Sequence, residues 1–390
     1  MNILMVAPYF PPYTDVGGLR MGSLARFLLK TGHSLTIVKL SDSCYPAGTS
    51  GGTRIPGITY VEFSNEHNFE ETALRLHSIL EDVAVSGSFD CCLVSCGPYF
   101  TLEPVLRLWE HFHIPFIIDY RDLWLYQPQP ITSPRMFLGR YKKRLLFHGL
   151  EKKVLNACSA FITCSPLPLQ TMIDHYPFIK GKAFCVFNGY DFPKGMPAAS
   201  PSSHAKGQEI QICNLGKLAY YSPRGARCLF LAADSLIKKG YPVRIVHIGS
   251  AEPLQEIIRK TGFPQEYYKN LGLLPYEKAI SVAASTHICV TICNYSIGLG
   301  TKLYDYIYLN KPVVAYVPKH SEFAEVMSKA ENAFVCQSAE QMSSAFETII
   351  TENRLTLTDN KAFVEQFSRE AQNKKFLRIL TEVAGKENRG

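Results

Sequence analysis

Short apolar runs alternate with helical segments along this chain, and that alternation constrains the fold more than any other feature. The first run, residues 2–7 (NILMVA), is apolar throughout, which is typical of a central parallel strand covered on both faces. A loop, a helix ending near Lys30 and a second strand, SLTIVKL, follow it. This βαβ opening has a right-handed crossover and predicts an α/β fold with a doubly wound parallel sheet.

The alternation is interrupted once and then starts again. Residues 193–208 (PKGMPAASPSSHAKGQ) are rich in Pro, Ser, Gly and Ala, as expected for a linker between domains. A chain of 390 residues is also too long for one typical core. We therefore predict two Rossmann-like domains facing a cleft, at residues 1–195 and 208–360. A C-terminal helix at 361–390 is expected to return to the first domain.

The composition excludes several classes of protein. Hydrophobic residues make up 46% and charged residues 19% of the chain, which is typical of a soluble globular protein, and no apolar run reaches the length of a membrane span. The N-terminus, MNILMVAPYF, lacks a basic region and is better explained as a strand than as a signal peptide. Twelve cysteines, with no CxxC pair, are scattered through apolar strands and predict reduced thiols in a cytoplasmic protein.

The net charge of +7 is concentrated in the segment from Arg140 to Lys153, RYKKRLLFHGLEKK. Its basic residues alternate with apolar ones, a pattern that fits peripheral docking on an anionic membrane, on the inner face of a cell membrane. It fits equally the solvated face of a helix packed on the sheet, and the sequence leaves both interpretations open. No recognition motif for nucleic acid is present, so we expect no nucleic-acid partner.

The stretch from Asn294 to Ala315, NYSIGLGTKLYDYIYLNKPVVA, has the layout of an anion site. A glycine loop precedes a helix whose first N–H groups lack intrahelical partners and carry the positive end of its dipole. Glycines let the backbone approach a phosphate, Lys302 adds a full charge, and Asp305 could accept hydrogen bonds from a ribose diol. The alternative is a surface turn whose glycines only satisfy tight geometry.

Two further segments of the first half carry candidate residues. Gly17 and Gly18 end a loop at a helix start and offer backbone N–H groups to an anion. The segment IIDYRDLW places charged and aromatic residues at the carboxyl end of a predicted strand, where open α/β sheets bind ligands. Arg121 and Asp122 could bind an acceptor sugar on which Trp124 stacks, or they could form a structural ion pair.

With these motifs in two domains, the chain resembles the GT-B glycosyltransferases of the family-4, retaining type, in the subgroup with an RDLW sequence. The resemblance extends over nearly the whole chain. It implies leaving-group catalysis by Lys217 and Arg224 on the donor diphosphate, and orientation of the acceptor by Asp122. The donor-binding residues that it implies are Gly17, Gly18, Gly249, Ser250, Leu274, Gly298, Leu299, Gly300, Thr301, Lys302 and Asp305, and the acceptor-binding residues are Arg121 and Trp124.

The resemblance has one departure. Asp305 falls at the second glutamate of the family's E-x7-E motif, whereas Ile297 falls at the first, which normally contacts the donor sugar. An apolar side chain there offers no partner to a hydroxyl, so it could favour a deoxy or N-acyl sugar, or it could signal lost activity.

The resemblance implies an enzyme, a hexosyltransferase of class EC 2.4. It would move a sugar, N-acetylated or deoxy in one interpretation, from a nucleoside diphosphate sugar that we expect to be UDP-linked. The acceptor would be a glycan, a lipid-linked molecule or a small molecule, and configuration would be retained. No cofactor is expected, because the nucleotide sugar is a substrate, and no DxD metal motif is evident. A nucleotide-sugar epimerase and a non-catalytic sugar-nucleotide-binding protein are the alternatives.

Overall fold

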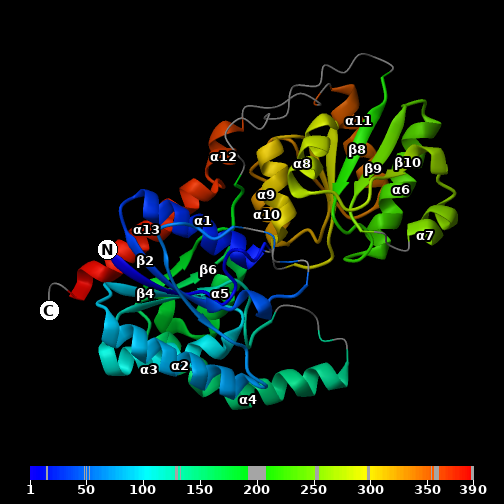
Figure 1. Ribbon diagram of the computed structural model, residues 1–390. Helices are drawn as coiled ribbons and strands as arrows, with labels where there is room; N and C mark the ends of the chain where they lie inside the picture. Colours follow the sequence, from blue (N-terminus) through cyan, green and yellow to red (C-terminus); the bar gives the residue numbers. More distant parts are fainter. Residues whose placement is uncertain are drawn as a thin grey trace. The chain divides into compact units, whose positions relative to one another are not determined.

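The computed structural model describes residues 1–14, 16–47, 49, 51, 53–127, 131, 133–191, 208–250, 254–296, 299–352, 354 and 360–387. The chain forms two compact units (Figure 1). The first comprises Met1–Asp191 together with Arg369–Gly390, and the second comprises Phe192–Ser368. The predicted linker, residues 193–208, lies outside the described residues except for Gln208.

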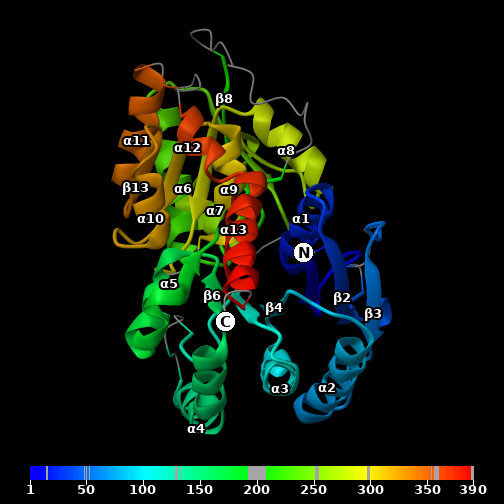
Figure 2. The same ribbon diagram turned by 90° about the vertical axis from the view of Figure 1, so that its left-hand side faces the viewer.

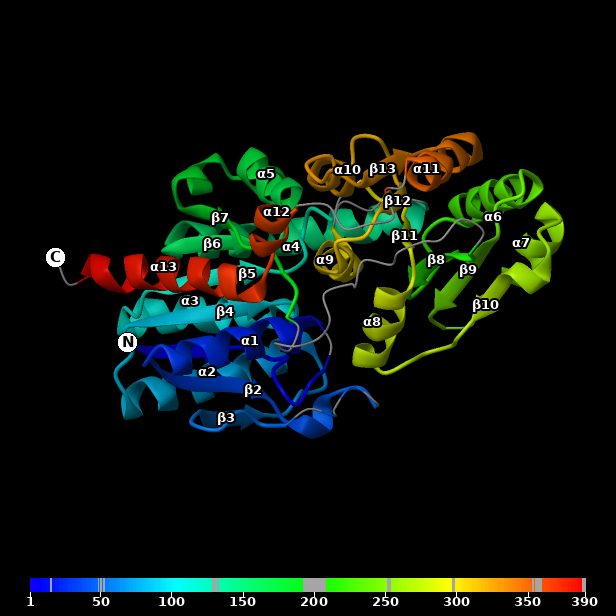
Figure 3. The same cartoon turned by 90° about the horizontal axis from the view of Figure 1, so that it is seen from above.

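The first unit is built on a seven-stranded parallel sheet, with the strand order β3-β2-β1-β4-β5-β6-β7 (Figure 3). The order reverses between β1 and β4, which is the arrangement of a doubly wound sheet. The prediction of a parallel α/β sheet is confirmed. The strands are β1 (Asn2–Val6), β2 (Ser34–Leu40), β3 (Thr59–Phe63), β4 (Cys91–Cys96), β5 (Phe116–Tyr120), β6 (Ala160–Thr163) and β7 (Ala183–Cys185).

Helices cover both faces of this sheet, because successive strand residues point to opposite sides. In β1, Leu4 and Val6 join a core with α2, α3 and α4, while Ile3 and Met5 join a core with α1 and α13. Figures 1 and 2 show these two helical layers. The helices are α1 (Val16–Lys30), α2 (Phe69–Ser86), α3 (Leu102–Phe112), α4 (Pro134–Ala157), α5 (Pro166–His175) and α13 (Arg369–Glu387).

The C-terminal helix α13 packs against α1, so the prediction that the chain end returns to the first domain is confirmed (Figure 2). Its apolar residues Phe376, Ile379 and Leu380 are buried there. The sequence predicted one C-terminal helix at residues 361–390, but the structure has two helices in this segment. A short helix, α12 (Lys361–Glu365), ends before α13 begins, and it belongs to the second unit.

The second unit contains a six-stranded parallel sheet, with the strand order β10-β9-β8-β11-β12-β13. This is the Rossmann order, and the direction of winding changes between β8 and β11. The edge strand β13 was not predicted from the sequence. The strands are β8 (Ile210–Leu215), β9 (Val243–Ile248), β10 (Tyr268–Asn270), β11 (Ile288–Ile292), β12 (Val313–Tyr316) and β13 (Ala333–Cys336).

One face of this second sheet packs against α6, α7 and α11 in a continuous apolar core. Helix α8 packs on β8 and also contacts α9. The helices are α6 (Pro223–Lys238), α7 (Leu254–Thr261), α8 (Tyr276–Ser285), α9 (Gly300–Leu309), α10 (Glu322–Met327) and α11 (Ala339–Thr351).

All twelve cysteines are free thiols, and burial raises the pKa of Cys91, Cys158 and Cys213 to about 12. A thiol with so high a pKa stays protonated at neutral pH and behaves as a small apolar side chain. Across the described ranges, the structure contains no helix of sufficient length and apolar character to cross a membrane.

Candidate functional site

In the second unit, β8 and β9 are paired strands, and the backbone segments that follow them approach each other closely because each begins with a glycine. A Cβ on Gly249 would lie 2.4 Å from the backbone oxygen of Gly216 and 2.8 Å from His247 Nε2, so a side chain cannot be placed there without displacing the neighbouring loop. Gly216 has φ +71°, the left-handed region that glycine adopts without strain. These two glycines let the backbone after β8 and β9 line one compact edge of the sheet.

Two lysines meet at the end of β8. The Lys302 ammonium group, from the first turn of α9, donates a hydrogen bond to the backbone oxygen of Lys217 at 2.9 Å. A Cβ on Gly216 would lie 2.8 Å from Lys302 Cε, so this glycine also leaves room for the lysine. The exposed Lys217 ammonium group lies 3.8 Å from the ring centroid of Tyr220, a cation–π contact. Positive charge from two elements is thus placed at one strand end.

The beginning of α9 is open toward an anion. Its N-cap residue, Leu299, provides no side-chain hydrogen bond to the first turn. Gly300 has φ +61°, and no atom lies within 4 Å of where its Cβ would be. Thr301 is exposed. A helix start with no side-chain cap and with a lysine in its first turn is suited to hold a phosphate group.

Arg224 lies in the first turn of α6 and is exposed. That turn packs closely on the sheet, because a Cβ on Gly225 would lie 2.5 Å from Tyr316 Cδ1 and 2.6 Å from Ile292 Cγ2. Burial raises the pKa of Tyr316, at the end of β12, and the positive charge of Arg224 lowers it in part. Similarly, the charge of Lys302 acts against the rise that burial causes in the pKa of Cys293, which follows β11. Both cations therefore lie near the carboxyl ends of these central strands.

Asp305 is buried on α9 and contacts the first residue of α8. Its Oδ1 accepts a hydrogen bond of 2.5 Å from the Tyr276 hydroxyl group. The side chain of Leu274, just before α8, is half-buried, and so is that of Ser250 after β9. These residues are in the same unit as the two lysines. Ile297 and Gly298 lie outside the described residues, so the departure from the family motif and one predicted donor contact have no structural account.

His247, which was not among the residues predicted from the sequence, is fully buried at the end of β9. Because a carbonyl oxygen can only accept, His247 Nε2 must be the donor in its 2.7 Å contact with the backbone oxygen of Gly216. His247 Nδ1 lies 2.9 Å from the Tyr268 hydroxyl group. A histidine within an otherwise apolar strand, VRIVHI, was the available signal.

In the first unit, the glycines predicted to end a loop lie within the first turn of α1, which begins at Val16. Gly17 is packed against Arg121, since a Cβ there would lie 2.1 Å from Arg121 Nη1. Arg121 Nη2 donates to the backbone oxygen of Gly97, and the guanidinium group lies 5.8 Å from the ring centroid of Tyr9. Arg121 Nε is buried and has no hydrogen-bond partner in the described part of the chain.

The structure corrects the stacking role predicted for Trp124. The side chain is only 3% exposed, and it stacks on Tyr99 with a centroid separation of 5.2 Å and an interplanar angle of 12°. Phe69 and Phe147 also contact the ring, at centroid separations of 6.4 and 5.0 Å. The Lys143 ammonium group lies 5.8 Å from it. A sugar cannot reach a ring that is enclosed in this way, so Trp124 belongs to the core.

Asp122 is exposed, and its backbone oxygen accepts a 2.5 Å hydrogen bond from the Tyr99 hydroxyl group. Near it in the fold, a pocket of about 300 Å³ lies where β1, β2, β3 and β4 end. The pocket is lined mostly by aromatic and hydrogen-bonding side chains, with two aliphatic ones: Tyr9, Leu40, Asn65, Glu66, His67, Asn68, Phe69, Thr72, Pro98 and Phe100. Tyr9, which contacts Arg121, joins this pocket to the predicted acceptor residues.

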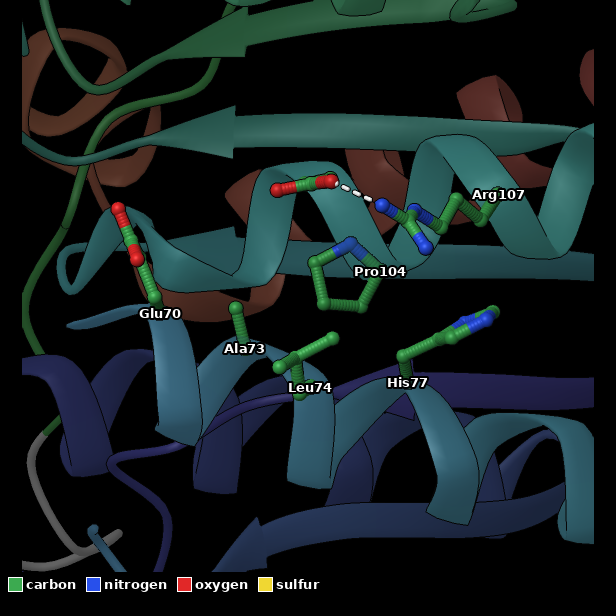
Figure 4. A pocket seen from close by; sticks show the side chains of 7 residues that line it. Glu70, Ala73, Leu74, His77, Pro104 and Arg107 are labelled. Atoms are coloured by element: carbon green, nitrogen blue, oxygen red, sulfur yellow. Dashed lines mark hydrogen bonds and ion pairs between the residues drawn. The ribbon is translucent and has the colours of Figure 1, made fainter. Parts of the chain in front are cut away.

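Figure 4 shows a second cavity, of about 250 Å³, between α2 and α3. It is lined by Glu70, Ala73, Leu74, His77, Glu103, Pro104 and Arg107, which include none of the predicted site residues. Glu103 and Arg107 form an ion pair of 2.5 Å across one turn of α3. Within the described ranges, no group of three or more His, Cys, Asp or Glu side chains could hold a metal ion.

No protein-family model matches this chain, and no curated protein matches its sequence. Solved structures do match it over nearly its whole length. A glycosyltransferase from Rickettsia africae superposes with a TM-score of 0.68 at 13% identity, covering 98% of both chains. The catalytic domain of starch synthase IV from Arabidopsis thaliana, bound to ADP and acarbose, gives 0.63 at 13% identity and covers 99% of both chains.

An α,α-trehalose-phosphate synthase (UDP-forming) from Burkholderia vietnamiensis also matches, with a TM-score of 0.60 at 13% identity, covering 98% of this chain and 100% of that one. Together with the two parallel sheets, these similarities show that the chain has the GT-B fold, as predicted. At such low identity the similarity concerns the fold. The family-4 assignment, the role of the RDLW segment and the site residues remain predictions.

Proposed function

We propose that this chain is a glycosyltransferase that moves a sugar from a nucleoside diphosphate sugar to an acceptor. The observation that carries the proposal is the meeting of Lys217 and Lys302 beside the uncapped start of α9. A diphosphate is the ligand whose charge this arrangement matches best. The fold supports the proposal, because its structural neighbours include an enzyme named as UDP-forming and another bound to ADP.

The chemistry requires cations at this place. When the sugar leaves, negative charge grows on the nucleoside diphosphate, and groups that bind that charge more strongly in the transition state accelerate the step. Lys217, Arg224 and Lys302 would provide this stabilisation, with backbone N–H groups of residues 299–302 completing the anion site. We infer that transfer needs no metal ion. Retention of configuration is the outcome that the family-4 resemblance implies, with the leaving phosphate helping to deprotonate the acceptor.

The nucleoside would lie along the same strand ends. Asp305, whose Oδ1 accepts a hydrogen bond from Tyr276, would accept further hydrogen bonds from ribose hydroxyl groups. The backbone at Gly249 and Ser250 and the side chain of Leu274 would border the ribose and base. UDP is our first expectation for the nucleotide, and ADP is the competing one.

We assign the acceptor to the first unit, in the pocket lined by Tyr9. Aromatic rings beside amide and carboxylate groups suit a hydroxyl-rich molecule, such as the sugar end of a glycan, of a lipid-linked intermediate or of a small glycoside. Arg121 contacts Tyr9, and Asp122 would orient the attacking hydroxyl group. Gly17 and Gly18 would contribute by letting the backbone of the first turn of α1 approach the bound substrates closely.

Calorimetric titration of the full chain with UDP and with ADP tests the donor site. We expect Lys217→Ala, Arg224→Ala and Lys302→Ala each to weaken the preferred nucleotide by about tenfold to a hundredfold, the effect of one charge-assisted hydrogen bond. Lys329→Ala is the matched control, because this exposed lysine precedes β13 at the opposite edge of the sheet. Unchanged affinity in all three site variants would show that the diphosphate binds elsewhere.

Incubation with a panel of nucleotide sugars in the presence of EDTA distinguishes the possible activities. Free nucleoside diphosphate together with a glycosylated acceptor supports metal-independent transfer. A donor whose sugar has changed configuration would indicate an epimerase, and binding without turnover would indicate a sugar-nucleotide-binding protein. Proton NMR of the new glycosidic bond reports whether the configuration is retained.

A further inference from the structure

Helix α4 (Pro134–Ala157) holds most of the chain's excess positive charge. It contains seven of the 41 Lys and Arg residues and one of the 34 Asp and Glu residues, Glu151, which is buried. The remainder of the chain is close to neutral, with 34 basic and 33 acidic residues. A single helix therefore dominates the electrostatic field that the first unit presents to a charged partner.

The same helix exposes an unusual amount of apolar surface. Among the described residues, five of the fourteen exposed large apolar side chains lie on it, and each is more than half exposed. They are Phe137, Leu138, Tyr141, Leu145 and Leu146, with exposed fractions of 57, 51, 53, 67 and 74%. Ile131, just before the helix, is 49% exposed. Contiguous exposed apolar side chains of this size mark an interaction surface.

The spacing of these residues forms a stripe. Phe137, Tyr141 and Leu145 follow one another at intervals of four residues and so lie on one face of the helix, where the rings of Phe137 and Tyr141 stack at 6.5 Å. The exposed Lys142 and Lys153 are eleven residues apart, about three helical turns, and so lie on the same side of the helix, along the flank of that stripe. We call the five exposed apolar side chains of α4, together with Lys142 and Lys153, the outer face of α4.

Other positions along the helix attach it to the protein. Lys143 donates to the backbone oxygen of Trp124 at 3.0 Å, and Arg144 donates to that of Leu125 at 3.1 Å. In the last turns, Val154 and Leu155 are completely buried. The helix thus lies along one side of the first unit (Figure 1), and the side chains of its outer face are exposed.

We propose that the outer face of α4 docks on the surface of a membrane that contains anionic lipids. Apolar side chains would enter the interface between headgroups and acyl chains, while Lys142 and Lys153 would bind lipid phosphates. The surface contains five exposed apolar side chains, which distinguishes it from a face built for nucleic acid, where phosphate contacts dominate. The inference stands apart from glycosyl transfer, because vesicle binding is measured without any sugar donor.

Co-sedimentation of the full chain with sonicated vesicles tests the proposal. We expect binding to vesicles of equal parts phosphatidylglycerol and phosphatidylcholine, weakening as salt rises from 0.05 to 0.3 M, and little binding to pure phosphatidylcholine. The double variant Lys142→Glu/Lys153→Glu should bind at least about tenfold more weakly, since each basic residue near the surface contributes about a factor of five. The control, Lys260→Glu/Lys329→Glu, has the same net charge but places both changes in the second unit.

A second pair of variants tests the apolar part. Leu145→Gln/Leu146→Gln should reduce vesicle binding about tenfold, whereas Leu74→Gln/Val85→Gln on α2, which changes two equally exposed apolar side chains, should leave it unchanged. Far-UV circular dichroism checks that each variant is folded. No binding to the anionic vesicles, or binding that the α4 variants do not alter, would overturn the proposal. Tight binding to poly(U), with the same affinity in the parent chain and in Leu145→Gln/Leu146→Gln, would identify the surface as a nucleic-acid site instead.

Discussion

His247 is completely buried at the end of β9, and its ring joins two neighbouring strand ends. One nitrogen donates to the backbone oxygen of Gly216, the residue that leads directly to Lys217. Through this contact we expect His247 to act as a positioning residue: its side chain is completely buried and holds the loop from which one of the cations extends. A buried imidazole with both nitrogens engaged leaves that loop few alternative positions.

We therefore expect His247→Ala to weaken nucleotide binding by about tenfold, the effect of one lost hydrogen bond, while leaving the fold intact. Tyr268→Phe is the matched variant, because it removes the hydroxyl group near Nδ1 and keeps the contact with Gly216. Its affinity should stay within about threefold of the parent chain. Titration calorimetry measures both. If His247→Ala binds as tightly as the parent, the loop is held by its glycines alone.

At the scale of a secondary-structure element, α4 combines its exposed outer face with a buried carboxyl group on the inner side. Glu151 accepts a hydrogen bond of 2.7 Å from the Tyr176 hydroxyl group and one of 3.3 Å from Tyr120. Burial raises the pKa of Glu151 from 4.5 to about 7, although these hydrogen bonds and the charges of Lys143 and Arg144 lower it. The carboxyl group therefore changes its charge near neutral pH.

The sign of the resulting stability change follows from proton binding. Between pH 4.5 and 7 the folded state binds more protons at Glu151 than the unfolded state, so protonation of Glu151 stabilises the folded state. This stabilisation is complete at low pH and is lost as pH rises through 7. We expect Glu151→Gln to gain stability relative to the parent chain between pH 5 and pH 8, by at most roughly 3 kcal/mol. The matched control is Glu110→Gln, at an exposed position on α3.

Tryptophan fluorescence during urea unfolding measures this effect in the first unit alone, since both tryptophans, Trp109 and Trp124, belong to it. A difference between Glu151→Gln and the parent that stays constant from pH 5 to pH 8 would contradict the raised pKa.

At the scale of the whole chain, the first unit is completed by residues from both ends of the sequence. Arg20 of α1 forms a bidentate pair with Asp119 of β5, at 2.8 and 3.0 Å, and both side chains are buried. The same guanidinium group donates to the backbone oxygen of Phe187 at 2.9 Å and lies 4.8 Å from the ring centroid of Phe376 on α13. One ion pair thus links the start of the chain, the sheet and the C-terminal helix.

Removing one partner leaves the other charge buried without compensation, which costs about 3–5 kcal/mol. We expect Asp119→Asn to lower the thermal unfolding midpoint of the first unit by roughly 6–20 °C, as followed by tryptophan fluorescence. Asp82→Asn, at an exposed position on α2, should shift it by less than about 2 °C. A similar midpoint in both variants would mean that the packing of α13, rather than this pair, holds the elements together.

The sequence by itself determined the architecture. Continuous apolar strands separated by helices, interrupted by one Pro- and Ser-rich segment, predicted two parallel α/β sheets, because such strands have no polar face to expose to water. The edge strand β13 was not predicted, since an apolar run of only four residues is too short to be told from a loop, and three of the four are only partly buried. The glycine–lysine pattern around Lys302 also pointed to the strand end at which the structure places this residue together with Lys217.

Only the tertiary structure decided which polar and aromatic residues remain accessible. Trp124 looked available in the RDLW segment, but Phe69 and Phe147, distant in the sequence, cover its ring. Asp119 and Arg121 are neighbours at one strand end, yet Asp119 is sealed in an ion pair with Arg20 while Arg121 packs on Gly17. Burial arises from contacts between separate elements, and a local pattern contains no record of them. For the same reason, the basic segment did not reveal which apolar side chains of α4 are exposed, and its docking on a membrane stays a prediction.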